Sequence, residues 1–276
     1  MQFALTDEQE MLRREVRRYF AQRYPETNEW DSSEWPELAK LGWTGISVPE
    51  ALGGTGLGLL DETVVFEECG RARFPGPFVT TVGLALPALD PERQARLAAG
   101  EATFSVTFDG ITAPDRDLVD EVITVTDPGT AERVRVRGFC ALALESVGIS
   151  QRALEIGVEH ARSREQFGRP IGVYQAVSHK LADTYVETEL ARSLAYWAAW
   201  CVTETDKDAR VAAASAKAYA ADAAVAACER SIQVLGGIGM TWEHVLHRYY
   251  KRAQWIQAFG GHAQRQRAFV AGALLD

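Results

Sequence analysis

Two short stretches carry most of the residue types that could bind a ligand. The first, residues 161–175 (ARSREQFGRPIGVYQ), places Arg164 and Gln166 beside a Phe-Gly turn and a Pro-Ile-Gly connector. The second, residues 233–243 (QVLGGIGMTWE), is a glycine-rich corner between two helical stretches. A guanidinium binds phosphate or carboxylate oxygens, and glycines let another molecule approach the backbone closely. The plainer alternative is that Arg164 pairs with a carboxylate of the protein and that the glycines only end a helix.

Long helices are the elements that must position these two stretches. Apolar residues recur at helical spacing over residues 142–162, 173–203 and 206–235, and the third segment is very rich in alanine. A final helical pair is predicted over 243–259 and 262–275. Four or more antiparallel helices with short connections make a bundle, and the two stretches lie roughly one helical hairpin apart in it.

The N-terminal part, residues 1–82, is predicted to be a separate helical domain. Thr6 and Gln9 form a capping signature before an apolar helical stripe, and further helices are expected from Trp35 and near Leu60. The glycine-rich loop 52–58 is interpreted as an interhelical loop, because no Lys-Ser/Thr pair follows it as in a phosphate-binding loop.

The middle part, residues 83–138, contains little that could form a sheet. Short helices are predicted over 83–99 and a strand over 102–108, and two shorter strands are expected at 122–125 and 134–136. A few short strands bury too little surface for an independent sheet domain. We therefore expect a mainly α fold: an N-terminal helical domain, a vestigial β segment, and a four-helix bundle over residues 139–276.

The composition restricts the classes of partner. The net charge of −9 argues against a nucleic-acid surface, and no apolar run is long enough to span a membrane. The first residues show no leader, so a cytoplasmic setting is expected. The cysteines lack CxxC spacing and are expected to be free and buried, with no metal site; they are Cys69, Cys140, Cys201 and Cys228.

Several motifs together resemble the acyl-CoA dehydrogenase family: RSREQFGRPIG at 162–172, YQAV at 174–177, QVLGGIG at 233–239 and TWEH at 241–244. The resemblance is strong over 139–257 and weaker over 1–110. It implies an enzyme that oxidises an acyl-CoA to its α,β-enoyl thioester, in which a carboxylate removes the α-proton and FAD accepts the β-hydride.

The resemblance also implies which residues bind FAD. The clamp that reaches across a subunit interface to the pyrophosphate and adenosine end of the cofactor would consist of Arg164, Gln166, Phe167, Gln233, Gly236 and Gly237. The family's contacts to the flavin ring lie mostly in its middle domain, which is too short here to supply them.

The catalytic base of the family has no counterpart at the expected positions. The stretch 255–261 (WIQAFGG) contains no carboxylate, and neither does the alternative family position near Ala141. Glu145 lies one helical turn further on and is a weak candidate, although a solvated or capping role is favoured. Glu243 is a second weak candidate, predicted to open a helix, where the dipole alone favours a carboxylate. His244 and His247 are interpreted as surface or packing residues.

A heteromeric subgroup of the family would explain both the short middle domain and the missing catalytic base. Bacterial acyl-CoA dehydrogenases of the α2β2 type, including those of steroid breakdown, pair a complete subunit with a degenerate one. The AFGGH tail at 258–262 resembles the degenerate type. We therefore expect a subunit that binds acyl-CoA and FAD only together with a second, fuller subunit that supplies the base.

Two other functions stay open at this point. The first is a self-sufficient homo-oligomeric dehydrogenase that uses Glu145 or Glu243 as its base. The second is a protein without cofactor on the same scaffold, either structural or a lyase or hydratase. The acyl group is not indicated by any residue pattern.

Overall fold

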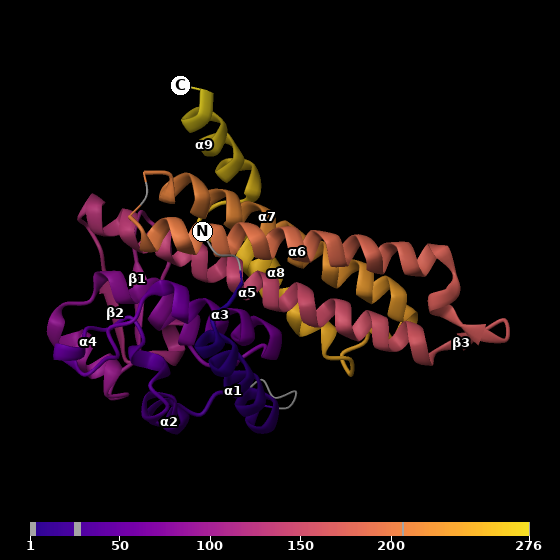
Figure 1. Cartoon of the computed structure of the whole chain (residues 1–276), viewed down its shortest axis with the longest axis horizontal. Helices are drawn as coiled ribbons and strands as arrows, with labels where there is room; N and C mark the ends of the chain where they lie inside the picture. Colours follow the sequence, from indigo (N-terminus) through magenta and orange to yellow (C-terminus); the bar gives the residue numbers. More distant parts are fainter. Residues whose placement is uncertain (1–3, 25–28, 206, 276) are drawn as a thin grey trace.

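The computed structural model describes residues 4–24, 29–205 and 207–275, and helices dominate it (Figure 1). The helices are α1 (Asp7–Arg23), α2 (Trp35–Lys40), α3 (Leu59–Ala72), α4 (Pro91–Ala98), α5 (Pro128–Ser163), α6 (Gln175–Thr203), α7 (Ala209–Leu235), α8 (Leu246–Ala258) and α9 (Ala263–Leu275). The strands are β1 (Phe104–Thr107), β2 (Glu121–Thr124), β3 (Glu165–Gln166) and β4 (Arg169–Pro170). The mainly α fold predicted from the sequence is confirmed.

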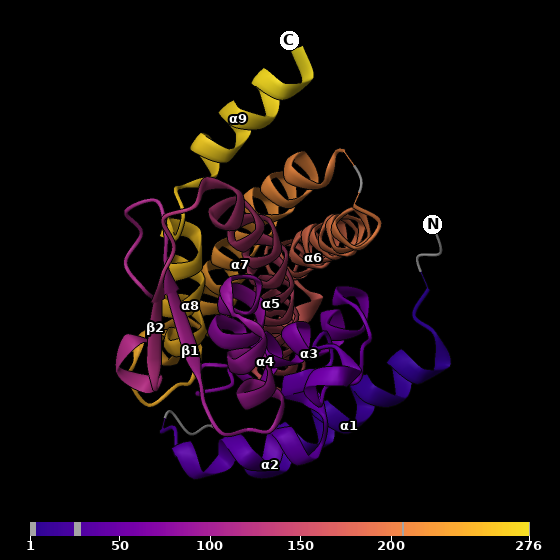
Figure 2. The same cartoon turned by 90° about the vertical axis from the view of Figure 1, so that its left-hand side faces the viewer.

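A bundle of α5, α6, α7 and α8 forms the body of the molecule (Figures 1 and 2). Alanine occupies most of the buried positions of α7, and its small side chain lets α5 and α6 pack closely on that helix. The N-terminal helices α1 and α2 lie on the other side of α3, which packs directly on α5. One continuous apolar core therefore joins the N-terminal helices to the bundle.

The predicted starts of the N-terminal helices are confirmed by the structure. The Thr6 hydroxyl accepts a bond of 3.2 Å from the Gln9 N–H, and the Gln9 amide accepts one of 3.1 Å from the Thr6 N–H. The helices α2 and α3 begin at or next to the predicted residues, and the loop 52–58 does connect two helical segments.

The middle segment contains one small sheet in which β1 and β2 pair in parallel, with Phe104 opposite Glu121. The strands predicted at 102–108 and 122–125 are thus confirmed. The strand predicted at 134–136 is wrong, because α5 begins at Pro128 and Val134 is buried inside that helix. The helix starts ahead of the boundary expected at 138–139, and the division into domains 1–82, 83–138 and 139–276 stays a prediction.

The four cysteines are buried and free, as predicted. Within the described ranges, no group of His, Cys, Asp and Glu side chains could hold a metal ion. None of the helices described combines the length and the hydrophobicity that a membrane-spanning segment needs.

Candidate functional site

A short hairpin built from β3 and β4 extends beyond the ends of α5 and α6 (Figure 1). Arg164 caps α5, since its N–H donates to the His160 carbonyl at 2.8 Å. Phe167 and Gly168 form the two-residue turn, with φ of 54° and 77°. A turn of this kind requires positive φ at both residues, which is costly for phenylalanine. The Phe167 side chain is nevertheless 92% exposed, so burial of the ring does not compensate for this strain.

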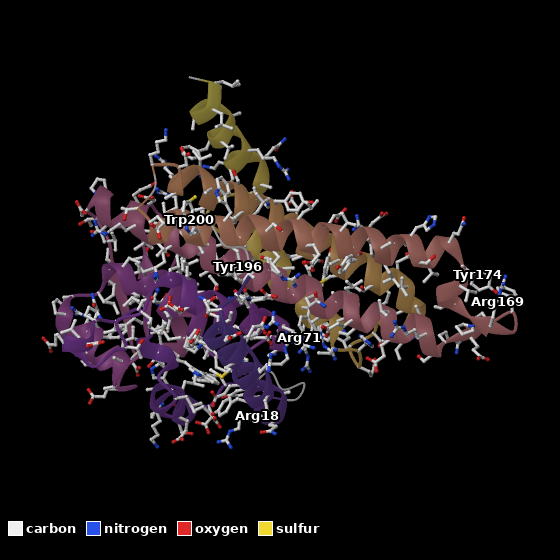
Figure 3. All side chains as sticks on the ribbon, viewed as in Figure 1. Arg18, Arg71, Arg169, Tyr174, Tyr196 and Trp200 are labelled. Carbon is white, nitrogen blue, oxygen red and sulfur yellow. The ribbon has the colours of Figure 1, made fainter. Side chains whose placement is uncertain are left out.

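The hairpin is held in shape by Tyr174 and Arg169, which the sequence analysis did not assign to the site. The Tyr174 hydroxyl donates to the Gln166 carbonyl at 3.1 Å, and the Arg169 guanidinium lies 4.8 Å from the centre of the Tyr174 ring. Phe167 contacts the same ring edge-to-face. Figure 3 shows Arg169 and Tyr174 at this end of the molecule, away from Arg71 and Tyr196. The Gln166 amide donates to the Glu165 carbonyl, and the exposed Arg164 side chain lies beside the hairpin.

The glycine-rich corner follows α7 and is open to solvent. Gly236 ends the helix with a φ of 67°. A Cβ atom built on Gly236 or Gly237 would meet nothing within 4 Å, so close packing within the chain does not explain these two glycines. The positive φ of Gly236 does favour glycine at that position. Gln233, in the last turn of α7, is exposed as well. The bare backbone here can be approached by another molecule.

The hairpin and the glycine corner lie at the same end of the bundle. A small apolar cluster joins them, in which Val234 next to Gln233 packs with Ala161 of α5 and with Ile171 after β4. The predicted clamp residues are therefore brought to one region. Arg164, Gln166, Phe167, Gln233, Gly236 and Gly237 are all exposed in that region.

The residues of this clamp fit one end of a dinucleotide. An exposed guanidinium at Arg164 suits a pyrophosphate, the Phe167 ring offers an apolar face, and the open backbone at Gly236 and Gly237 suits close approach. The exposure of all these groups means that a second surface would have to cover the ligand. The structure thus supports half of a cofactor site.

The stretch 255–261, where the base was expected, covers the end of α8 and the turn before α9, and that turn contains Gly260 and Gly261. Gly260 has a φ of 66°, and a Cβ atom there would come within 2.7 Å of the Phe139 ring. A longer side chain at residue 260 would therefore require Phe139 to move. Phe259, Gly260 and Gly261 line a cavity of about 900 Å³ together with the loop of residues 109–118.

The clamp and this turn are far apart. The Lys217 side chain of α7 contacts the turn, whereas the glycine corner follows Leu235 at the end of the same helix. These two residues are separated by about 27 Å at the helical rise per residue. A cofactor end bound at the clamp is thus remote from the cavity that Gly260 lines.

Glu145 is neither solvated nor a cap, so that preference was wrong. It is 6% exposed, and Arg252 of α8 donates to its two carboxylate oxygens at 2.7 and 3.0 Å. The pair lines a cavity of about 180 Å³ with Cys69, Arg73 and Asp115. Both oxygens of Glu145 are engaged, which leaves this carboxylate badly placed to accept a proton from a substrate.

Glu243 does not open a helix, because α8 begins at Leu246. Its exposed carboxylate accepts hydrogen bonds from its own backbone N–H and from Thr241, and these bonds lower the pKa of Glu243. Next to it in the chain, His244 accepts a hydrogen bond of 3.2 Å from the Leu246 N–H through its Nδ1 atom, and the His247 ring lies 4.8 Å from that of Trp242. The packing role predicted for these two histidines is consistent with this arrangement.

Two family models match the chain. One is described as the acyl-CoA dehydrogenase C-terminal domain and matches residues 138–275, and the other as the acyl-CoA dehydrogenase N-terminal domain and matches residues 6–90. The segment 91–137 lies between the two matches. This is where the sequence analysis expected the middle domain to be largely missing.

Similar proteins are found among curated sequences and solved structures. Acyl-CoA dehydrogenase IpdE2 of Mycobacterium tuberculosis is 34% identical over 267 residues, which cover 81% of each chain. A structure of the Tcur3481-Tcur3483 steroid ACAD is 24% identical with a TM-score of 0.86 and coverage of 98% of both chains. The ChsE4-ChsE5 complex from Mycobacterium tuberculosis is 23% identical with a TM-score of 0.85, covering 100% of this chain and 99% of the other.

Proposed function

Because the chain belongs to the acyl-CoA dehydrogenase family, we propose that it is the base-less subunit of a heteromeric acyl-CoA dehydrogenase. FAD is the cofactor of the family, and it supplies the acceptor for the hydride that leaves the β-carbon of the acyl group. A fuller partner subunit would provide the catalytic carboxylate and the surface for the flavin ring. The complexes among the structural neighbours support an assembly of two different chains, and an α2β2 heterotetramer is the arrangement we favour.

The role of this chain is to bind and orient the far end of the cofactor. The Arg164 guanidinium would neutralise the pyrophosphate, and the Gln166 amide would bind polar edges of the adenosine. Phe167 would pack on the cofactor, while Gln233 and the backbone of Gly236 and Gly237 would border it from the α7 side. The Tyr174–Arg169 contact keeps the hairpin ordered before the cofactor arrives.

The observation that carries this proposal is the turn after α8, which has glycines and no carboxylate where the base of the family is expected. The clamp is exposed at one end of the bundle, about 27 Å along α7 from the turn after α8, where Gly260 has no space for a side chain. A single copy therefore has a cofactor-binding end but lacks a proton acceptor beside it. A partner subunit that supplies the carboxylate would resolve this mismatch. Because a structural neighbour is named a steroid ACAD, a steroid-derived acyl-CoA is the substrate class that we propose to test first.

Co-expression with a fuller acyl-CoA dehydrogenase subunit tests the proposal. We expect the chain alone to be colourless and the co-purified complex to be yellow, with flavin absorbance and with reduction of a ferrocenium acceptor by an acyl-CoA. Arg164→Ala in the complex should lose at least about tenfold in FAD affinity, as expected for a charge-assisted pyrophosphate contact.

Arg133→Ala is the matched control, because Arg133 is an exposed arginine near the start of α5, at the other end of the bundle. It should leave the FAD content unchanged. A yellow homo-oligomer that turns over acyl-CoA without a partner would instead support the self-sufficient enzyme. A colourless chain that stays colourless with every fuller subunit would support the scaffold without cofactor.

A further inference from the structure

Lys217 is the only buried side chain with a positive charge in the part of the chain that the structure describes. Its relative exposure is 0%, and it lies among the alanines of α7. The buried carboxylates each pair with an arginine; they are Glu62, Glu67, Glu68 and Glu145. Lys217 instead donates to two backbone carbonyls, those of Gln257 at 3.0 Å and Gly261 at 2.8 Å.

These two carbonyls lie on either side of the turn that connects α8 and α9. Gln257 is in the last turn of α8, where carbonyl groups lack partners within the helix and where a cation is favoured. Gly261 is at the end of the turn, just before α9 begins. One ammonium group, with three donors on a flexible stem, therefore ties both ends of the turn to α7.

Three further contacts hold the same turn. The Gln266 amide of α9, also buried, donates to the Gly260 carbonyl at 2.8 Å and to the Gly261 carbonyl at 3.4 Å. Gly260 faces the Phe139 ring, and the Lys217 ammonium lies 5.7 Å from the centre of that ring. The backbone of the turn is thus fixed by side chains from α5, α7 and α9.

The burial of a charge is not required for a stable helix contact, because an apolar side chain of similar size could fill the same space. The hydrogen bonds explain why a lysine is present at residue 217. A long side chain that ends in a donor can reach the carbonyls on both sides of the turn. The turn forms one wall of the 900 Å³ cavity, and Trp255, whose ring centre lies 5.0 Å from that of Phe259, belongs to the same wall.

We propose that Lys217 is a positioning residue that fixes the α8–α9 turn against Phe139. It thereby keeps the base-less wall of the cavity and the direction of α9 in a single conformation. Figures 1 and 2 show α9 leaving the bundle from this turn, with only its first part close to α7. The inference concerns the chain by itself and does not depend on the partner or on FAD.

Hydrogen exchange of the full chain, measured peptide by peptide, tests this role. In Lys217→Met we expect the amides of residues 258–266 to exchange at least tenfold faster, while those of α3 stay within twofold of the parent protein. Lys217→Gln keeps two N–H donors on a shorter stem and should give an intermediate rate. Lys180→Met changes an exposed lysine of α6 in the same way and should leave the exchange of the turn unchanged.

A uniform increase over all helices, or no increase at the turn, would overturn the proposal. If Lys217→Met does not fold, Gln266→Ala removes the donors on the opposite side of the turn with a smaller change in the core. The same residues, 258–266, should then exchange faster, and a turn that remains fully protected in this variant would refute the role of these side chains.

Discussion

The buried ion pair with Arg252 gives Glu145, one of the candidate bases, a role in stability. Replacing Arg252 with methionine leaves the Glu145 carboxylate buried without its partner, and we expect a loss of about 3–5 kcal/mol in the free energy of unfolding. Urea unfolding at neutral pH measures this loss. The double variant Glu145→Met/Arg252→Met removes both charges and should be less destabilised than either single variant. Strict additivity of the two single losses would contradict the pairing.

Glu145→Gln tests the chemical role of the same residue. The glutamine keeps the shape and part of the hydrogen bonding to Arg252, so the complex should retain an acyl-CoA oxidation rate close to that of the parent. Removal of a general base would cost about 10²–10⁴-fold in rate. A loss of that size at full FAD occupancy would restore Glu145 as the base and reject its structural role.

The titration of Lys217 gives a pH dependence with a definite sign. Burial lowers the pKa of Lys217 from 10.5 to about 8. Between these two values the unfolded chain binds a proton that the folded chain does not, so the contribution of Lys217 to the free energy of unfolding rises with pH. The full effect corresponds to about 3 kcal/mol.

Urea unfolding of the parent and of Lys217→Met at pH 7 and pH 10 isolates this contribution, because the other titrating groups cancel in the difference. We expect the parent to gain stability relative to Lys217→Met at the higher pH. A difference that is constant or that falls with pH would contradict the lowered pKa.

At the scale of single elements, α3 and α5 are in closer contact than their sequences suggest. A Cβ atom on Gly70 of α3 would overlap the carbonyl oxygen of Glu145, and one on Gly148 of α5 would overlap that of Glu67. The two glycines therefore let the helix backbones touch reciprocally. Gly70→Ala should force the helices apart and lower the free energy of unfolding by about 3 kcal/mol or more.

Gly272→Ala is the control for this prediction, because Gly272 lies in α9 and a Cβ atom there meets nothing within 4 Å. Alanine is the better helix former, so this variant should be neutral or stabilise α9 by up to about 1 kcal/mol. Thermal unfolding compares the two variants. Equal behaviour of Gly70→Ala and Gly272→Ala would reject the close helix contact.

Elements whose signals are local could be predicted from the sequence. The capping box of Thr6 and Gln9 needs only neighbouring residues, and it was found. The start of α5 also has a local signal that was missed, since Asp127 caps the helix and Pro128 occupies its first position. The pairing of Glu145 could not be predicted, because its partner is 107 residues away and only the packing of α5 on α8 brings the two together.

In the candidate site, too, the residues with a local sequence signal could be predicted and the contacts between distant residues could not. The clamp residues follow each other in two short motifs, and the bundle brings both motifs to one end. Arg169 and Tyr174 belong to the stretch 161–175 and could have been assigned to the site from the sequence, because they lie only a few residues from Gln166. The support of the base-less turn by Lys217 depends on α7 and α8 lying side by side, which no local pattern indicates.

At the scale of the whole molecule, the outer face of α6 carries a group of exposed apolar side chains that a partner could cover. Tyr185, Val186 and Leu190 are each at least 50% exposed on this helix, and exposed apolar groups that lie together indicate an interface. We expect Tyr185→Ser/Leu190→Ser to fold like the parent, since neither side chain is buried, but to bind the fuller subunit about tenfold more weakly or worse.

Two measurements separate assembly from folding in this variant. Thermal unfolding of the isolated chain should shift little, whereas native mass spectrometry of the co-expressed chains should show less complex and more free chain. Met11→Ser, a change of a 61% exposed residue on α1, should leave the amount of complex unchanged. If both variants assemble equally well, α6 does not face the partner, and the interface must lie on another surface, such as that around the hairpin and the glycine corner.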